Sequence, residues 1–488
     1  MKRKRIYLDN TATTRTRNEV ITAINRYFKK IYGNPSSIHT AGNIARGSIE
    51  MARERIAGAL DSSSDEIFFT GSGSESNNLA IRGTVKMFGK EKNIISSQIE
   101  HSSMLETVKE LERSGLEVRY IKVDKTGRYD IDDLERKMDD NTGLVALSYV
   151  NNEIGTVQDI RALTGAVKKR RALLHLDAVQ ALPYFTISAK NIGADLMSFS
   201  GHKIYAPKGI GVLFVRNGTP IAGTVTGGGQ ERGLRSGTEN VPYIVGLSKA
   251  VWLNNREKAR YVEKLTALRD MLIMGVLNSV KDAILTGHPS DRAPNHASFC
   301  FKGINGKMLV KKLSIHGIEA SSGSACSSPK NEPSHVLAAC GIDDEFIRGS
   351  LRLSLGKYNS RKDVLRLLAV LPEVLSVMRA IEVEYDNEGI FISQEEFRSK
   401  ISSGESIQIV DIRDFSVPRQ MIKGALRMPS FKIAKDFRKL NKDAETVIVC
   451  YQGDVLSPEI HEFLKGKGFK KIRVLKGGMF SYSGHAPY

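Results

Sequence analysis

The sequence predicts an α/β protein: a mostly parallel sheet with flanking helices, then a smaller α+β segment, and then a second, small α/β domain. Short apolar segments of strand length alternate with segments of helical periodicity from Glu66 onward, which is typical of a parallel sheet wrapped by helices. The alternation ends after the glycine cluster at 227–229 and returns beyond Ile390. A chain of 488 residues has room for two or three domains. We expect a first unit at 1–383, a linker at 384–389 and a second unit at 390–488.

The elements of the first unit follow from the spacing of its apolar residues. Val20, Ile24 and Phe28 recur at helical spacing, whereas Ile67-Phe68-Phe69-Thr70 is a short run of strand length. Helices are expected at 18–30, 43–60, 75–87, 103–114 and 160–170, and strands at 67–70, 93–97, 117–123, 144–150, 173–176 and 195–199. The smaller part should hold a helical region at about 240–280, strands near 296–301 and 350–354 and a helix at 362–379. We expect a large domain at about 15–240 and a small domain from the N-terminal segment plus about 241–383.

The second unit opens with Ser393 and Glu396, which have the spacing of a capping box at the start of a helix. Cys450 directly follows an apolar segment of strand length. Strands are expected at 407–410, 447–449 and 472–475, and a helix at 458–466. This pattern indicates a small α/β domain.

Composition excludes several classes of protein. No apolar run approaches the roughly 20 residues that a membrane-spanning helix needs. The basic start, Met1 to Arg5, continues into Ile6-Tyr7-Leu8-Asp9 and not into the apolar core of a signal peptide. Four cysteines in so long a chain are no disulfide framework and favour the reducing cytoplasm.

The formal net charge of +18 is unusual. It is compatible with an acidic protein partner or with contact to tRNA. No helix or loop concentrates lysine and arginine with interleaved aromatic residues. We therefore favour a charge that is spread for solubility and expect no direct binding of nucleic acid.

The candidate site is centred on Lys203. The apolar strand ending near Phe199 runs into a turn of small residues, Ser200-Gly201, and then into His202 and Lys203. A lysine held there can form a Schiff base with a cofactor carbonyl, although the same residue could lie in a surface loop. Upstream, Gly71-Ser72-Gly73-Ser74 stands between a strand and a helix, where free N–H groups and the helix dipole bind phosphate.

Two further residues complete the pattern. Asp177 follows an apolar strand, and its carboxylate could pair with a protonated pyridine nitrogen or simply cap a helix. His101 follows the strand at 93–97 and could stack on a ring, shuttle protons near neutral pH or pack in the core. The order of glycine turn, histidine, aspartate and lysine favours pyridoxal 5′-phosphate (PLP), which needs these partners.

The span from Ile6 to Arg379 resembles the cysteine desulfurases of the NifS/IscS type, which belong to the class V aminotransferase-like group of PLP fold type I. The resemblance covers most of the chain, and its motifs are specific and colinear. They are Tyr7-Leu8-Asp9-Asn10-Thr11-Ala12-Thr13-Thr14, Gly33-Asn34-Pro35-Ser36-Ser37, Val150-Asn151-Asn152-Glu153-Ile154-Gly155, Ser200-Gly201-His202-Lys203, Gly229-Gln230-Glu231-Arg232-Gly233, Arg235-Ser236-Gly237-Thr238 and Ser321-Ser322-Gly323-Ser324-Ala325-Cys326.

The resemblance implies roles for individual residues. Lys203 would be the Schiff-base lysine, Asp177 the partner of the pyridine nitrogen and His101 a residue near the ring. Arg352 would bind the substrate carboxylate, a task suited to a guanidinium. The phosphate would be held by Gly73, Ser74, Ser200 and His202, and Thr238 would reach the phosphate bound in a neighbouring subunit of a homodimer. Gln180 would contact the ring hydroxyl. Asn152 would lie near the ring and the substrate, and Asn34 would contact the substrate. Relatives often have an Ala-Thr pair where Gly73-Ser74 stand, so the hydroxyl is kept.

Cys326 is the expected sulfur acceptor. It lies in a Ser/Gly-rich stretch, as suits a reactive thiol that must travel, whereas Cys300 stands between Phe299 and Phe301 and Cys340 is expected to pack a helix end. By the resemblance, Cys326 would take the sulfur of L-cysteine as a persulfide and leave L-alanine, with Lys203 moving the α-proton and His101 handling the thiol proton. The acceptor would be an iron–sulfur scaffold or a tRNA-thiolation enzyme.

Residues 390–488 resemble a rhodanese domain. The segments that carry this resemblance are Ile409-Val410-Asp411-Ile412-Arg413, Ile422-Lys423-Gly424-Ala425, Val447 to Gly453 and Leu475-Lys476-Gly477-Gly478. Cys450 would be a second persulfide carrier. The family usually has an arginine where Val455 stands, and the usual Gly-His is altered around Arg419-Gln420. An internal relay from Cys326 to Cys450 and an inactive docking domain both remain open.

These observations predict a dimeric, cytoplasmic, PLP-dependent cysteine desulfurase without a metal site. The alternatives are a class V aminotransferase or selenocysteine lyase, which would not depend on Cys326, and a non-catalytic sulfur-carrier or scaffold protein.

Overall fold

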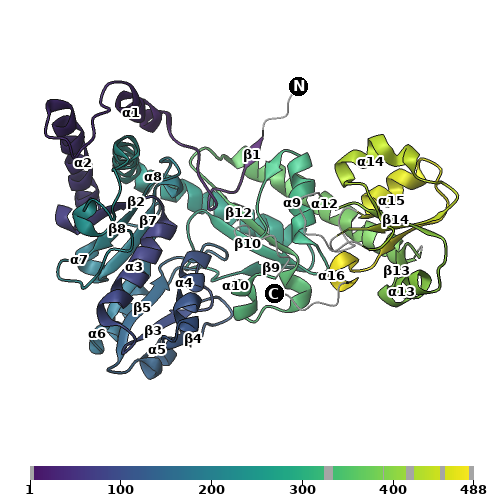
Figure 1. The fold of residues 1–488 in the computed structure, drawn as a ribbon, viewed down its shortest axis with the longest axis horizontal. Coiled ribbons are helices and arrows are strands. Elements are labelled where there is room, and N and C mark those ends of the chain that lie inside the picture. The colour runs from purple at the N-terminus through teal and green to yellow at the C-terminus, as the bar shows by residue number, and fades with distance from the viewer. Residues whose placement is uncertain (1–4, 324–332, 388, 414–421, 451–456, 483–488) are drawn as a thin grey trace. The chain divides into compact units, whose positions relative to one another are not determined.

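A computed structural model describes residues 5–323, 333–387, 389–413, 422–450 and 457–482. The chain forms two compact units, Met1–Pro372 and Glu373–Tyr488. Each unit is built around its own sheet (Figure 1). No helix among the described residues is both long and apolar enough to cross a membrane.

A seven-stranded sheet forms the centre of the first unit. All its neighbouring strands run parallel except β8, which is antiparallel to both β2 and β7. The order is β2 (Ile67–Thr70), β8 (Gly211–Val215), β7 (Leu196–Ser200), β6 (Leu173–Asp177), β5 (Thr142–Ser148), β3 (Asn93–Ser97) and β4 (Val118–Ile121). The predicted, largely parallel α/β sheet is thereby confirmed; β8 was not predicted, although its run Gly-Val-Leu-Phe-Val is apolar enough for a strand.

The strands of this sheet are buried on both faces. In β5, Val145 and Leu147 belong to one hydrophobic cluster, and Leu144 and Ala146 to another. Since successive side chains of a strand point to opposite faces, a strand covered on both sides reads as a continuous apolar run. The helices of this part of the chain are α1 (Asn18–Lys29), α2 (Thr40–Ala59), α3 (Gly73–Phe88), α4 (Ser102–Arg113), α5 (Ile131–Lys137), α6 (Ile160–Lys169), α7 (Ala189–Ile192) and α8 (Val241–Ser279).

The smaller part of the first unit contains an antiparallel sheet in the order β12 (Ser350–Ser354), β10 (His296–Phe301) and β9 (Ala283–Thr286). The strands predicted near 296–301 and 350–354 are confirmed. The N-terminal strand β1 (Ile6–Tyr7) pairs in parallel with β11 (Ile318–Glu319), a contact that the sequence did not predict. The helices here are α9 (Gly306–Ile315), α10 (His335–Ala339), α11 (Asp344–Ile347) and the first part of α12 (Arg361–Asn387), which continues past Pro372 into the second unit.

Helix α12 extends further than predicted. It continues to Asn387, so residues 384–387 of the expected linker are helical. The stretch from Glu373 to Asn387 contains neither proline nor glycine, and nothing in it forces a helix to end.

The second unit holds a parallel five-stranded sheet. Ser393 caps its first helix by accepting from the Glu396 N–H at 3.1 Å, while the Glu396 carboxylate pairs with Arg473 instead of closing the predicted box. The strand order is β13 (Phe391–Ile392), β17 (Ile472–Leu475), β16 (Glu445–Val449), β14 (Ile407–Asp411) and β15 (Leu426–Arg427); the helices are α13 (Gln394–Ser402), α14 (Ser430–Asp436), α15 (Ser457–Lys465) and α16 (Gly478–Tyr482). The predicted small α/β domain is confirmed.

A buried ion pair ties helix α2 to the segment that follows the glycine cluster. Arg53 Nη1 and Nη2 donate to the two Glu231 carboxylate oxygens at 2.9 and 3.0 Å, and the Phe69 N–H donates to the same carboxylate at 2.8 Å. The side chains of Arg53 and Glu231 are only 5% and 2% exposed. Removing one partner leaves the other charge buried without compensation.

We expect Glu231→Gln to lower the free energy of unfolding of the first unit by about 3–5 kcal/mol. Denaturant unfolding followed by the fluorescence of Trp252, the single tryptophan of the chain, measures this unit. Glu50→Gln is the matched control, because Glu50 also pairs with Arg53 but its side chain is 52% exposed; it should cost less than about 1 kcal/mol. Equal losses in the two variants would contradict the buried pair.

Candidate active site

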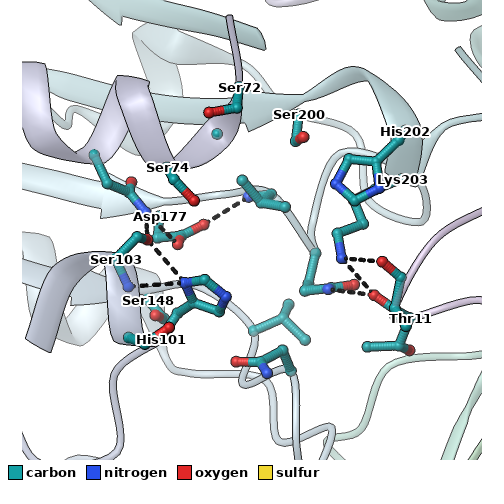
Figure 2. Close-up of a pocket in the computed structure, with 18 of the residues that line it drawn as sticks. Thr11, Ser72, Ser74, His101, Ser103, Ser148, Asp177, Ser200, His202 and Lys203 are labelled. Carbon is teal, nitrogen blue, oxygen red and sulfur yellow. Dashed lines mark hydrogen bonds between the residues drawn. The ribbon is translucent and has the colours of Figure 1, made fainter. Parts of the chain in front are cut away.

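A pocket of about 330 Å³ lies where β5, β6 and β7 end and α3 and α4 begin (Figure 2). The carboxyl ends of parallel strands are the usual place for ligands on such a sheet. The structure brings ten of the sequence-predicted residues together in its lining: Gly73, Ser74, His101, Asn152, Asp177, Gln180, Ser200, His202, Lys203 and Arg352.

Lys203 ends the short turn η2 (Gly201–Lys203) directly after β7. Its Nζ donates to the carbonyl oxygens of Thr11 at 2.6 Å and Ala12 at 2.8 Å (Figure 2). Gln180 Nε2 also donates to Thr11 O, at 3.2 Å. The N-terminal segment thus lies beside the lysine, a contact that the sequence did not predict.

The glycine turn forms a polar cradle at one end of the pocket. The Ser72 hydroxyl caps α3 by accepting from the Glu75 N–H, and Gly73 is the first residue of this 16-residue helix. A Cβ at Gly73 would lie 2.9 Å from Val179 Cγ2 and 3.1 Å from Ser200 Cβ, so the start of the helix packs closely against both side chains. The helix N-terminus and the neighbouring hydroxyls suit a phosphate group.

Asp177 is the last residue of β6 and is 7% exposed. Its Oδ1 accepts from the Val179 N–H at 3.0 Å, and its Oδ2 accepts from Asn77 Nδ2 at 2.8 Å. The carboxylate therefore caps a turn and not a helix. With one donor on each oxygen it is held in place and can still face a cationic ring nitrogen.

His101 lies at the opposite side of the pocket from Lys203 (Figure 2). Its Nδ1 accepts from the Ser103 N–H at 3.1 Å and lies 2.8 Å from Ser103 Oγ. Burial lowers the pKa of the His101 imidazole, and the Asp177 carboxylate opposes this shift. His101 is consequently a residue of the pocket wall and not a core histidine.

His202, beside the lysine, is also held in its neutral form. Its Nδ1 lies 3.1 Å from Thr13 Oγ1, and burial lowers the pKa of the ring to about 4. The neutral ring can donate or accept a hydrogen bond at the pocket without adding charge.

Arg352 enters the pocket from β12 with a side chain only 3% exposed. Its Nη1 donates to Asn152 O at 3.0 Å and its Nη2 to Asp9 Oδ1 at 3.1 Å, whereas the buried Nε has no hydrogen-bond partner. Burial raises the pKa of Asp9, and Arg352 opposes that shift. A guanidinium with an unused buried N–H suits a carboxylate ligand.

The remaining predicted residues do not line the pocket in the described chain. Asn34 lies in an exposed loop, where its Oδ1 accepts from the Ser36 N–H, and Thr238 is exposed. Cys450 follows β16 in the second unit and is 6% exposed. Cys326, Val455 and Arg419-Gln420 lie outside the described residues.

The two cysteines expected to be structural are buried. Cys300 is part of β10, and Cys340 caps the C-terminus of α10 as predicted. Burial raises the pKa of each thiol to about 12. A thiol with such a pKa carries almost no thiolate near neutral pH and is a poor nucleophile.

Glu100, which the sequence analysis missed, is fully buried beside His101. Its carboxyl accepts from the Tyr129 hydroxyl at 2.6 Å and from the Ser148 hydroxyl. Burial raises the pKa of Glu100 to about 8, and the Asp177 carboxylate raises it as well. The only sequence signal was a charged residue between Ile99 and His101 after a buried strand.

The residues present fit PLP. Lys203 supplies an amine for its carbonyl, the turn around Gly73 a cradle for its phosphate, and Asp177 an oriented carboxylate for its ring nitrogen. The buried Asp177 carboxylate, which is held by one donor on each oxygen, is the structural feature that carries this fit.

Comparison with known proteins agrees with this geometry. A family model of class-V aminotransferases matches residues 6–367, and one of the rhodanese-like domain matches residues 393–485. A cysteine desulfurase IscS of Dictyoglomus turgidum is 43% identical over 382 residues, which cover 78% of this chain and 97% of that protein. A cysteine desulfurase IscS of Methanosarcina thermophila is 45% identical over 377 residues, 77% of this chain and 93% of that protein.

Solved structures give the same answer. A NifS-like protein has a TM-score of 0.72 and 38% identity, covering 76% of this chain and 100% of that one. A structure described as SspA in complex with cysteine has a TM-score of 0.64 and 33% identity, and the match covers 73% of this chain and 100% of that one. The chain belongs to the class-V aminotransferase family and, within it, to the cysteine desulfurases, and it carries a rhodanese-like domain as well. Members of this family depend on PLP.

We expect Glu100 to make the first unit less stable as the pH rises. The unfolded chain loses this proton near the ordinary pKa of 4.5, whereas the folded protein keeps it to about pH 8. Between these values the folded state binds more protons, so the free energy of unfolding falls with rising pH. The fall is at most about 5 kcal/mol, at roughly 1.4 kcal/mol for each pKa unit.

Glu100→Gln should therefore reduce the difference in unfolding free energy between about pH 5 and about pH 8, measured by urea unfolding with Trp252 fluorescence. Glu106→Gln is the matched control, since the Glu106 side chain on α4 is 61% exposed. If the Glu100 variant loses as much stability with pH as the wild type, Glu100 is not a buried neutral carboxyl.

Proposed function

We propose that this chain is a PLP-dependent enzyme that removes sulfur from L-cysteine and leaves L-alanine. The observation that carries the proposal is one pocket that is lined by Lys203, Asp177, the Gly73 cradle and Arg352. Lysine, aspartate and cradle suit the cofactor, and the arginine suits the carboxylate of an amino acid. Membership of the cysteine desulfurase family supports the choice of substrate.

The cofactor would be held by residues already in the lining. Lys203 Nζ would be its point of attachment, Asp177 would pair with the ring nitrogen and Gln180 with the ring hydroxyl. The phosphate would be bound by Gly73, Ser74, Ser200 and His202. When bound, PLP withdraws electrons from the α-carbon of an amino acid and so makes the bond between Cβ and sulfur easier to break.

The protein's own residues would orient the substrate and move its protons and sulfur. Arg352 would bind the carboxylate, beside Asn152, and Lys203 Nζ would take the α-proton. The Cys326 thiolate would attack the substrate sulfur: the bond between Cβ and sulfur breaks, a sulfur–sulfur bond to Cys326 forms, and Cβ gains a proton. L-alanine and a persulfide on Cys326 are the products.

A homodimer is part of the proposal. Thr238 is exposed and does not line the pocket of its own chain, which is compatible with a contact to the phosphate in a second subunit. Asn34 also lies in an exposed loop, and large apolar side chains near it are exposed: Phe28 at 58%, Tyr32 at 82% and Ile38 at 91%. Such a surface suits burial against another copy. The dimer would deliver sulfur in the cytoplasm to an iron–sulfur scaffold or a tRNA-thiolation enzyme.

The rhodanese-like domain would pass the sulfur on through Cys450. The outer sulfur of the Cys326 persulfide would transfer to the Cys450 thiolate, which restores the Cys326 thiolate. The match of the rhodanese-like family model to residues 393–485 supports this role.

We expect the holoenzyme to be yellow and to form alanine from L-cysteine, with Lys203→Ala colourless and inactive. Cys326→Ala should keep the absorption band of the cofactor but lose at least about 100-fold in alanine formation, because no thiolate accepts the sulfur. Cys340→Ala is the control with an unreactive buried thiol. If the variant without Cys326 forms alanine equally well, the result favours a class V aminotransferase or selenocysteine lyase. If the wild-type protein is colourless, the result favours a non-catalytic sulfur-carrier or scaffold protein.

Cys450→Ser should leave alanine formation unchanged while delivery of sulfur to an added thiol or acceptor protein falls several-fold. The readout is transfer of ³⁵S from labelled L-cysteine, with Cys300→Ser as control. Undiminished delivery would remove the relay and leave a docking role for the domain.

A further inference from the structure

Four polar groups form a continuous hydrogen-bonded chain along one wall of the pocket. Asp177 Oδ2 accepts from Asn77 Nδ2 at 2.8 Å, and Asn77 Nδ2 also donates to Ser103 Oγ at 2.9 Å. Ser103 Oγ lies 2.8 Å from His101 Nδ1 (Figure 2). This chain joins the carboxylate expected at the ring nitrogen to the histidine expected beside the ring, through two residues with no role so far.

The partners decide where each hydrogen lies. Asn77 must turn its NH₂ toward Asp177, because its carbonyl oxygen would repel the carboxylate. Both amide hydrogens are then used, while the buried Oδ1 of Asn77 has no donor. Since Ser103 Oγ accepts from Asn77, its own hydrogen is available for His101 Nδ1, which also receives the Ser103 N–H.

We propose that Asn77 and Ser103 are positioning residues that hold His101 as the tautomer protonated at Nε2, so that the ring presents an N–H donor to the pocket. Two donors at Nδ1 leave that nitrogen as the acceptor, and a neutral imidazole carries its single hydrogen on the other. The ring edge with Nε2 faces the pocket (Figure 2).

This inference rests on the proposed function and refines it. An Nε2 atom that already carries a hydrogen cannot take the proton of the substrate thiol. His101 can instead donate a hydrogen bond to the sulfur or to the ring. L-cysteine must then react as its thiolate, or lose the thiol proton to a different group.

The tautomer is also compatible with the surrounding charge. Burial favours the neutral ring, as the lowered pKa of His101 indicates. The titratable and charged groups that face it are Asp177 on β6, His202 and Lys203 after β7, His335 on α10 and Arg352 on β12. Among these groups only Asp177 favours protonation of His101, and Asn77 already donates to its Oδ2 atom.

The direct test is ¹⁵N NMR of the holoenzyme labelled at the histidine ring nitrogens. The His101 signals are assigned by their loss in His101→Gln. We expect a hydrogen on Nε2 and an unprotonated Nδ1 near neutral pH. A hydrogen on Nδ1 overturns the proposal, whatever the activity of the enzyme.

Ser103→Ala tests the positioning role. Without the hydroxyl donor at Nδ1, the midpoint for protonation of His101 should rise by about one pH unit, the size expected of a single hydrogen bond. Ser103→Thr should restore the wild-type midpoint, and Thr84→Val controls for loss of another buried helical hydroxyl, on α3. If Ser103→Ala changes neither the protonation midpoint nor the tautomer of His101, the positioning role of Ser103 is overturned. Alanine formation by the same samples reports on the proposed function separately.

Discussion

The hydrogen bonds from Lys203 Nζ to the carbonyls of Thr11 and Ala12 connect the lysine at the end of β7 to the N-terminal segment of the chain. Asp9, in the same segment, pairs with Arg352. The segment is itself anchored by the pairing of β1 with β11. One short stretch therefore sets the distance between the amine and the guanidinium, and the arrangement of the whole pocket depends on it.

On the side of the pocket opposite Lys203, burial determines whether Glu100 and His101 are protonated. Burial raises the pKa of Glu100 to about 8 and lowers that of His101, so both side chains are neutral at pH 7. Their neutrality keeps extra charge away from Asp177, whose oxygens are held by Val179 and Asn77. Donors fixed in a dry site need no rearrangement when charge develops on a bound group.

The local sequence was a good guide wherever a feature depends on neighbouring residues. Apolar runs predicted β2, β5 and β6, small residues predicted the turns at Gly73 and Gly201, and apolar neighbours identified Cys300 as a core cysteine. The same reasoning missed β8, although its run is apolar enough for a strand, and it missed the β1–β11 pair, because a strand of two residues shows no periodicity before it is paired.

The sequence by itself determined the fold class, the order of the elements and most side chains of the pocket, since periodicity and turn chemistry act over a few residues. The tertiary structure alone decided how these side chains are held. Asp9, Asn77, Glu100 and Ser103 carry no distinguishing local pattern, and their partners lie between 2 and 343 residues away. The pKa of a carboxyl and the tautomer of a histidine depend on burial and on the donors nearby, and these exist only after the chain has folded.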